Sequence, residues 1–307
     1  MTSRWLRGLN PEQREAVKTV DGPLLVLAGA GSGKTRVITH RIAYMIEQGV
    51  PAEQILALTF TNKAAAEMRE RLKAMVGRVV EKVTLRTFHA LGLYMLREEA
   101  AHRRRAGRFV IFDQGDQMAC LREIAGRLRM DRSFDLGAVA SRISAYKNAF
   151  ISPEAMEASD DPYEQATQAF YPAYLEMLEA QAAVDFDDLV CKPTQMMERS
   201  KACRSRWSDR FQRVLVDEYQ DTNSAQLRML RAIAGEHMNL CVVGDDDQSI
   251  YGWRGAEVKN ILQFATDFPG GRTAAFFFSA TTVRWPRCWT WPTRSSRPTL
   301  IGIPRAC

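Results

Sequence analysis

The sequence predicts an α/β protein with a parallel sheet flanked by helices and a mostly helical insertion. Short apolar runs alternate with helical patterns over residues 23–88, an order typical of β-α-β units. From about residue 98 to 185 the patterns are almost entirely helical, and apolar runs return at 213–217 and 240–244. The sheet is therefore expected to combine two stretches of chain separated by helices.

Local signals predict the individual elements. Asn10 as N-cap and Pro11 at the first helical position predict a short helix. Apolar runs bounded by turns predict strands, and apolar residues at helical spacing predict helices. Strands are expected at residues 23–27, 54–60, 83–88, 109–112, 213–217, 240–244 and 272–278. Helices are expected at residues 10–18, 36–42, 62–75, 113–129, 135–148 and 162–184.

Bulk composition narrows the class of protein. The 307 residues are 46% hydrophobic and 25% charged, as in globular proteins. No run approaches the roughly 20 apolar residues of a membrane span, and the first ten residues lack a signal-peptide core, so a cytoplasmic location is expected. The six cysteines form no Cys-x-x-Cys pair, which argues against a zinc site. The net charge of +6 says little about nucleic acid, because residues 279–307 contribute five arginines and no acid.

A glycine-rich segment separates the first predicted strand from its helix. The segment consists of Ala28, Gly29, Ala30, Gly31, Ser32, Gly33, Lys34 and Thr35, followed by Arg36. Its spacing is that of a phosphate-binding loop, with Ala28 in place of the usual first glycine. Backbone N–H groups would surround phosphate, Lys34 would neutralise the β- and γ-phosphates, and Thr35 would offer a hydroxyl to magnesium. The alternative is a glycine-rich turn with a chance Lys-Thr pair.

Two acidic residues, Asp217 and Glu218, end a predicted strand. In a parallel sheet this places both carboxylates at the carboxyl edge, where ligands of such folds bind. Beside a phosphate loop, the first acid can hold magnesium and the second can polarise a water molecule. A strand-terminal acidic turn is the structural alternative.

The segment from Gly244 to Ala256 joins a strand end to polar and aromatic side chains. Gln248 has the chemistry to hydrogen-bond a γ-phosphate or orient water, and Tyr251 and Trp253 could stack on bases. Without its context, a solvated acidic turn with a core tryptophan would be the favoured interpretation of this segment.

Seven motifs in order closely resemble superfamily 1 DNA helicases of the UvrD, Rep and PcrA type. They are Leu9–Gln13, Ala28–Thr35, Thr59–Ala65, Thr87–Ala90, Asp185–Leu189, Val216–Asn223 and Gly244–Ala256. The match spans about 250 residues, and the resemblance rests on the order of the motifs and not on any one of them.

The resemblance implies a RecA-like P-loop NTPase core and an ATP-dependent 3′–5′ DNA helicase or translocase. ATP and Mg²⁺ would be its cofactors, and single-stranded and duplex DNA its partners, together with repair or replication proteins. Gln13 would read adenine, Lys34 and Thr35 would hold phosphate and magnesium, and Asp217 would bind magnesium. Glu218 would be the general base.

Further roles are implied at the remaining motif positions. Gln248 would sense the γ-phosphate, and Arg254 would couple the nucleotide site to DNA. The expected lining of the single-strand path is Phe60, Asn62, His89, Tyr251 and Trp253. Ordinary packing is the alternative for these side chains, and the Arg103–Arg105 run is expected to be a solvated connector.

The resemblance also implies a domain order. Residues 1–100 and 186–278 would form the RecA-like core, with residues 101–185 as the helical inserted subdomain. Residues 279–307 break the pattern, and shifting their reading frame allows Asn-Tyr-Arg-Ser, as the family has there. We therefore expect a frameshifted, disordered tail and little or no unwinding by this polypeptide. A non-motor nucleotide-dependent DNA-binding module and an inert truncated product are the alternatives.

Overall fold

The computed structural model describes most of the chain. The described residues are 3–29, 31–102, 109–129, 134–235, 237–245, 259–269 and 274–278. The Arg103–Arg105 run and the tail from residue 279 lie outside these residues.

A parallel sheet forms the centre of the protein, as the sequence predicts. Its strands are β1 (Leu24–Ala28), β2 (Ile55–Thr59), β3 (Thr84–Thr87), β6 (Arg213–Val216), β7 (Leu240–Gly244) and β8 (Ala274–Phe278). Within the described residues the sheet has six strands, in the order β3-β2-β6-β7-β1-β8, and all its pairings are parallel. The order brings the carboxyl ends of β1, β6 and β7 together, although they are far apart in sequence.

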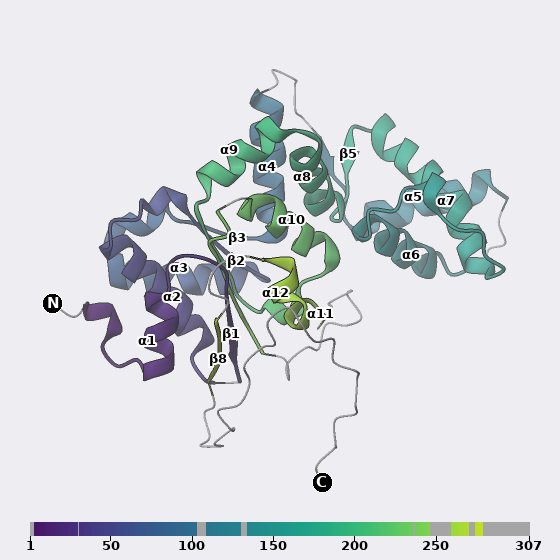
Figure 1. The fold of residues 1–307 in the computed structure, drawn as a ribbon. Helices are drawn as coiled ribbons and strands as arrows, with labels where there is room; N and C mark the ends of the chain where they lie inside the picture. Colours follow the sequence, from purple (N-terminus) through teal and green to yellow (C-terminus); the bar gives the residue numbers. More distant parts are fainter. Residues whose placement is uncertain are drawn as a thin grey trace, which may run out of the picture.

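Both faces of the sheet are covered by helices (Figure 1). One face packs against α1 (Pro11–Lys18), α2 (Lys34–Glu47) and α3 (Asn62–Val76). The other packs against α4 (Phe88–His102), α8 (Asp188–Arg199), α9 (Lys201–Arg210), α10 (Ser224–Ala234), α11 (Lys259–Leu262) and α12 (Phe264–Asp267). In β1, Leu24 and Val26 join the first core, whereas Leu25 and Leu27 join the second. This alternation explains why the strands read as unbroken apolar runs.

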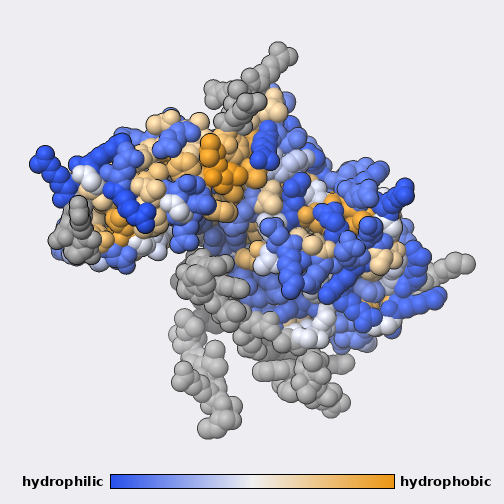
Figure 2. Space-filling view, turned by 180° about the vertical axis from the view of Figure 1, so that it is seen from behind, coloured by the Kyte–Doolittle hydropathy of each residue, from blue (hydrophilic) through white to orange (hydrophobic). Residues whose placement is uncertain are grey.

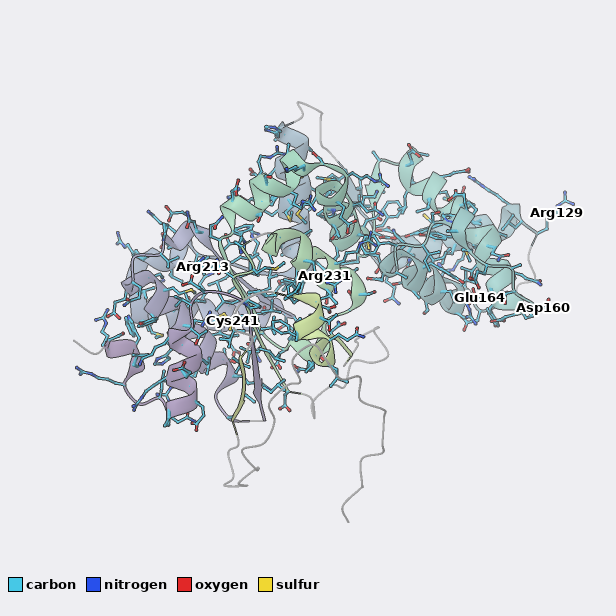
Figure 3. The ribbon with its side chains drawn as sticks, viewed as in Figure 1. Arg129, Asp160, Glu164, Arg213, Arg231 and Cys241 are labelled. Carbon is cyan, nitrogen blue, oxygen red and sulfur yellow. The ribbon has the colours of Figure 1, made fainter. Side chains whose placement is uncertain are left out.

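A helical region lies to one side of the sheet (Figure 1). It consists of α5 (Gln114–Arg127), α6 (Leu136–Asn148) and α7 (Pro162–Ala180), around a core that includes Phe170 and Tyr174. Arg142 on α6 pairs with Glu164 on α7 at 3.0 Å. In Figure 3, Glu164 and Asp160 lie at the end of the helical region that is far from Cys241 in the sheet. The predicted helical insertion is confirmed, and its exact domain boundaries stay a prediction.

The prediction of a helix through residue 184 was wrong. The helix α7 ends at Ala180, Ala182 adopts a left-handed φ of 47°, and β5 (Ala183–Val184) follows. This short strand pairs in parallel with β4 (Val110–Ile111), where a strand was expected. The backbone N–H of Phe112 donates to the carbonyl of Val184 at 2.9 Å. Pairing with a distant segment therefore outweighs the local helical preference.

Two further observations concern the surface and the cysteines. Seen from behind, the surface is mainly hydrophilic, with a hydrophobic patch where the helical region meets the rest of the protein (Figure 2). Among the described residues, no helix combines the length and apolarity required to cross a bilayer. The four described cysteines, at positions 120, 191, 203 and 241, are buried thiols.

Candidate functional site

The loop after β1 has the conformation that its glycines permit. Gly31 and Gly33 have φ values of 71° and 93°, in the left-handed region that side chains disfavour. The backbone N–H of Ser32 donates to the carbonyl of Gly29 at 3.2 Å, which closes the turn. Lys34 then starts α2. The loop thus leads directly into a helix N-terminus, whose N–H groups and dipole favour anions.

Lys34 lies where three strand ends meet. Its side chain is only 9% exposed, and its Nζ is 3.1 Å from Asp245 Oδ2 and 3.7 Å from Glu218 Oε2. Asp245 directly follows β7, and Glu218 is the second residue after β6. Asp245 was not predicted as a site residue, although an acid directly after an apolar run is a signal that could have identified it.

Asp217 is buried beside the first turn of α2. Its Oδ1 accepts from the backbone N–H of Glu218 at 3.1 Å, and its Oδ2 is 3.5 Å from Thr35 Oγ1. Burial and the neighbouring Glu218 raise the pKa of Asp217 to about 6, against the opposing effects of that N–H, Lys34 and Thr35. Burial thus disfavours the charged form of this carboxylate, and a bound cation would favour that form.

Glu218 has an uncommon backbone conformation, with φ at 53°. Its Oε2 accepts from Gln220 Nε2 at 2.8 Å, and Gln220 Oε1 accepts from the backbone N–H of Asp245 at 3.0 Å. Gln220 is 1% exposed, so its amide orients Glu218 and ties the end of β6 to the end of β7. This role was not predicted, because it depends on a contact across the sheet.

The pair formed by Thr35 and Asp217 fits a magnesium ion. A hydroxyl and a carboxylate face each other beside the helix that starts at Lys34, and Mg²⁺ usually binds through one or two carboxylates plus substrate phosphates and water. The described residues contain no cluster of three or more His, Cys, Asp or Glu side chains that could hold a metal ion by themselves.

Gln13 lies against the glycine-rich loop. Its Nε2 donates to the carbonyl of Ser32 at 3.0 Å, and its Oε1 accepts from the backbone N–H of Asn10 at 3.2 Å. Asn10 Oδ1 in turn accepts from the backbone N–H of Gln13, which completes a capping box at the start of α1. The amide orientation of Gln13 is therefore fixed by contacts on both sides.

A cavity of about 1350 Å³ lies between the sheet and the helical region. It extends from Thr35, Asp217 and Glu218 to two predicted DNA-contact residues, Phe60 and His89. Phe60 packs on Phe88 with ring centroids 5.8 Å apart, and burial lowers the pKa of His89. The predicted contact residue Asn62 is exposed at the start of α3.

Phe186 is an additional aromatic in this cavity. It is 52% exposed, and its ring lies edge-on to His89 with centroids 6.1 Å apart. The two residues meet because α4 and α8 pack closely at Gly92. A Cβ added there would lie 1.6 Å from the carbonyl oxygen of Leu189. An exposed phenylalanine inside the Asp185–Leu189 motif is the sequence signal for this position.

The structure brings together the acidic pair and the glycine-rich loop, as predicted from sequence. In the loop, Ala28 is buried at the end of β1, and Gly29 and Arg36 are exposed. The positions outside the described residues are Ala30, Gln248, Tyr251, Trp253 and Arg254. Their predicted roles therefore stay predictions.

The fold and the loop define the class of protein as a RecA-like α/β P-loop fold with a helical insertion. A family model agrees with this assignment over residues 9–269, and the chain belongs to the family described as the UvrD/REP helicase N-terminal domain.

Curated relatives point to the same family. The chain is 43% identical over 271 residues to the ATP-dependent DNA helicase PcrA of Staphylococcus aureus, and 42% identical over 271 residues to that of Staphylococcus epidermidis. Each match covers 87% of this chain and 37% of the relative. The chain thus spans well under half the length of the curated relatives that it matches.

Proposed function

We propose that this chain binds Mg²⁺ and ATP at the carboxyl edge of its sheet and provides the nucleotide-binding part of an ATP-dependent DNA helicase. The observation that carries the proposal is the position of Lys34 between Glu218 and Asp245, with Thr35 facing Asp217. A lysine at a helix N-terminus with exchangeable acidic partners is suited to bind phosphate.

Each residue of the site has a distinct proposed role. Lys34 exchanges its carboxylate contacts for phosphate oxygens, while the backbone of residues 28–36 surrounds the phosphates. Thr35 and Asp217 hold Mg²⁺, which neutralises phosphate charge when bound. Glu218 is 39% exposed and held by Gln220, so it can accept a proton from an attacking water.

The nucleobase is proposed to bind at Gln13. With its Oε1 toward Asn10 and its Nε2 toward Ser32, the amide has one acceptor site and one N–H remaining. This combination matches the N6 and N7 edge of adenine. Guanine would present O6 to the acceptor side, which disfavours it.

Single-stranded DNA is proposed to bind in the cavity through its bases. Phe60, His89 and Phe186 offer ring surfaces for stacking. The charged residues of the lining are mostly acidic, so phosphates would face away from these walls. The acidic lining residues are Glu67, Asp113, Asp185, Asp187, Asp217, Glu218 and Asp221.

The coupled activity is proposed from the relatives, which are described as ATP-dependent DNA helicases. In this proposal, the helicase of which this chain forms the nucleotide-binding part moves 3′–5′ along single-stranded DNA, driven by ATP hydrolysis at Glu218. Gln248 and Arg254 would link the nucleotide to the DNA path.

Binding of a fluorescent ATP analogue and ATP turnover test the proposal. We expect Mg²⁺-dependent binding that Lys34→Ala abolishes and that the surface variant Lys192→Ala retains. Glu218→Gln should retain binding and lose turnover by at least about 100-fold, as expected for loss of a general base.

The same assay separates the candidate activities. Turnover stimulated by single-stranded DNA supports the helicase motor, whereas binding without turnover supports a non-motor module. Absence of both contradicts the proposed function.

A further inference from the structure

The segment Asp185–Leu189 connects the helical region to α8 and carries Phe186 into the cavity. None of the roles assigned above explains its three carboxylates, at positions 185, 187 and 188. Two consecutive residues at the end of α6, Lys147 and Asn148, contact all three. The backbone on both sides of Phe186 is therefore held by a neighbouring helix.

Lys147 fixes the outer two carboxylates. Its Nζ lies 2.7 Å from both oxygens of Asp185 and 2.7 Å from Asp188 Oδ1. Tyr174 donates from its hydroxyl to Asp185 Oδ2 at 2.9 Å. Because lysine and acids are all buried, this cluster holds the two ends of the segment rigidly.

Asn148 holds the middle carboxylate and also contacts a second segment. Its Nδ2 donates to Asp187 Oδ1 at 2.7 Å and to the carbonyl of Ser144 at 2.8 Å. Its Oδ1 accepts from Asn223 Nδ2 at 2.9 Å. One side chain thus bridges the residue after Phe186 and the residue that starts α10.

Asn223 belongs to the loop that begins at the nucleotide site. It is the N-cap of α10 and follows the turn Tyr219–Asp221, which starts directly after Glu218. The turn is internally bonded, because Thr222 Oγ1 donates to the carbonyl of Tyr219 at 2.7 Å. Tyr219 and Thr222 are fully buried. A displacement at Glu218 would therefore be passed on to Asn223 instead of being absorbed within the turn.

We propose that Asn148 is a positioning residue that couples occupancy of the nucleotide site to the placement of Phe186, and thereby to the affinity for single-stranded DNA. The inference rests on the proposed function. Bound phosphate replaces Glu218 at Lys34, and the turn after Glu218 shifts. Asn223 then moves Asn148, which moves Asp187 and the adjoining Phe186.

The coupling can be measured as a ratio of two affinities in the full chain. The dissociation constant for a fluorescent oligothymidylate is determined without nucleotide and with saturating Mg²⁺ and a non-hydrolysable ATP analogue. Couplings between sites are typically about 5- to 150-fold, so we expect a ratio of at least about fivefold for the wild type. Asn148→Asp should bring the ratio close to one, because its carboxylate would face Asp187.

A double variant tests whether Asn148 positions Phe186 or only stabilises the fold. In the double variant N148D/D187N, the new amide at 187 can donate to the new carboxylate at 148, which still accepts from Asn223. We expect its ratio to return to within about twofold of wild type. Asn239→Ala is the matched control, because Asn239 accepts from the backbone N–H of Gly22 at the opposite edge of the sheet. This control should leave the ratio unchanged.

Hydrogen exchange supplies a readout independent of DNA. Nucleotide should change exchange of the amides of residues 185–190 in the wild type and the double variant, but not in Asn148→Asp. An unchanged ratio in Asn148→Asp, or no recovery in the double variant, overturns the inference. A wild type that binds nucleotide and DNA with a ratio of one overturns the coupling but not the proposed function. A wild type that binds no nucleotide overturns both.

Discussion

Lys34 and Lys147 are both buried lysines with two acidic partners, yet their surroundings differ. Lys147 contacts Asp185 and Asp188 at 2.7 Å, and both acids are 5% exposed. Lys34 contacts Asp245 at 3.1 Å and Glu218 at 3.7 Å, and Glu218 is 39% exposed. Both acidic partners of Lys147 are buried, whereas Lys34 has one buried partner, Asp245 at 2% exposed, and one, Glu218, that solvent reaches.

The difference separates a structural cluster from a binding site. Burial opposes the charge on Lys147, but Asp185 and Asp188 outweigh it and hold the pKa of the lysine above its usual range. Tight, desolvated pairs are costly to break. Lys34 has one such buried partner in Asp245, but its 3.7 Å contact with the half-exposed Glu218 can be exchanged for a ligand at little cost. The contact between Lys34 and Glu218 is thus suited to exchange for phosphate.

The largest expected effect is that of Lys147→Ala, which leaves the buried Asp185 without its lysine partner and Asp188 with only the more exposed Lys192. We expect the free energy of unfolding to fall by about 3–5 kcal/mol, measured by urea denaturation. Lys192→Ala is the control, since Lys192 also pairs with Asp188 at 3.2 Å but is 44% exposed. It should cost less than about 1 kcal/mol. Equal losses of stability in the two variants would contradict the assignment of Lys147 to a structural cluster.

Gly92→Ala tests the packing that positions the acids of the Lys147 cluster. The new Cβ would meet the carbonyl of Leu189, so α4 and α8 must separate. We expect a loss of about 3 kcal/mol in the free energy of unfolding and weaker oligonucleotide binding, because His89 and Phe186 move apart. Gly126→Ala, where nothing lies within 4 Å of an added Cβ, is the matched control. Wild-type stability in Gly92→Ala would contradict the close approach of the helices.

Lys34→Ala examines the other lysine. Without nucleotide, we expect the free energy of unfolding to fall by about 1–3 kcal/mol, less than in Lys147→Ala, because Asp245 is buried at 3.1 Å but Glu218 is 39% exposed at 3.7 Å. A ligand at 100 times its dissociation constant stabilises by about 2.7 kcal/mol, and this gain should disappear in the variant. Denaturation with and without Mg²⁺ and ATP measures both quantities. A large loss in the absence of nucleotide would assign Lys34 to the structural class.

The smallest expected effect concerns Asp221, whose Oδ1 is buried without a hydrogen-bond partner. Burial and the nearby Glu218 raise its pKa to about 6, with Lys34 opposing. The folded state therefore retains the proton above the ordinary pKa, and wild-type stability falls as the pH rises from about 4 to 6. Asp221→Asn should be about 1 kcal/mol more stable than wild type at pH 7, and the gain should vanish near pH 4. A pH-independent difference in unfolding free energy would contradict the assignment to this carboxyl group.

Sequence patterns predicted the sheet and the meeting of Lys34 with Asp217 and Glu218. This was possible because loops after parallel strands share one edge of the sheet. The strand β5 was missed, since two residues carry no measurable periodicity. The helices α4, α8, α9 and α10 were also not predicted.

The contacts of Gln220 and Asn148 could not be predicted from the sequence either. Each joins segments whose proximity is set by the order of strands or by helix packing. Local patterns contain neither kind of information. Gly92 is a similar case. Only the packing of Leu189 beside it shows why a residue with a side chain would not fit at this position.

The place of β1 between β7 and β8 has a consequence for biosynthesis. The strand emerges early from the ribosome, yet both of its neighbours, β7 and β8, lie beyond residue 239. Until they are translated, the apolar sequence Leu-Leu-Val-Leu-Ala has no strand to pair with on either side. Nascent chains would therefore have to shield this segment, by chaperones or by provisional burial under α2, until β7 and β8 have been translated.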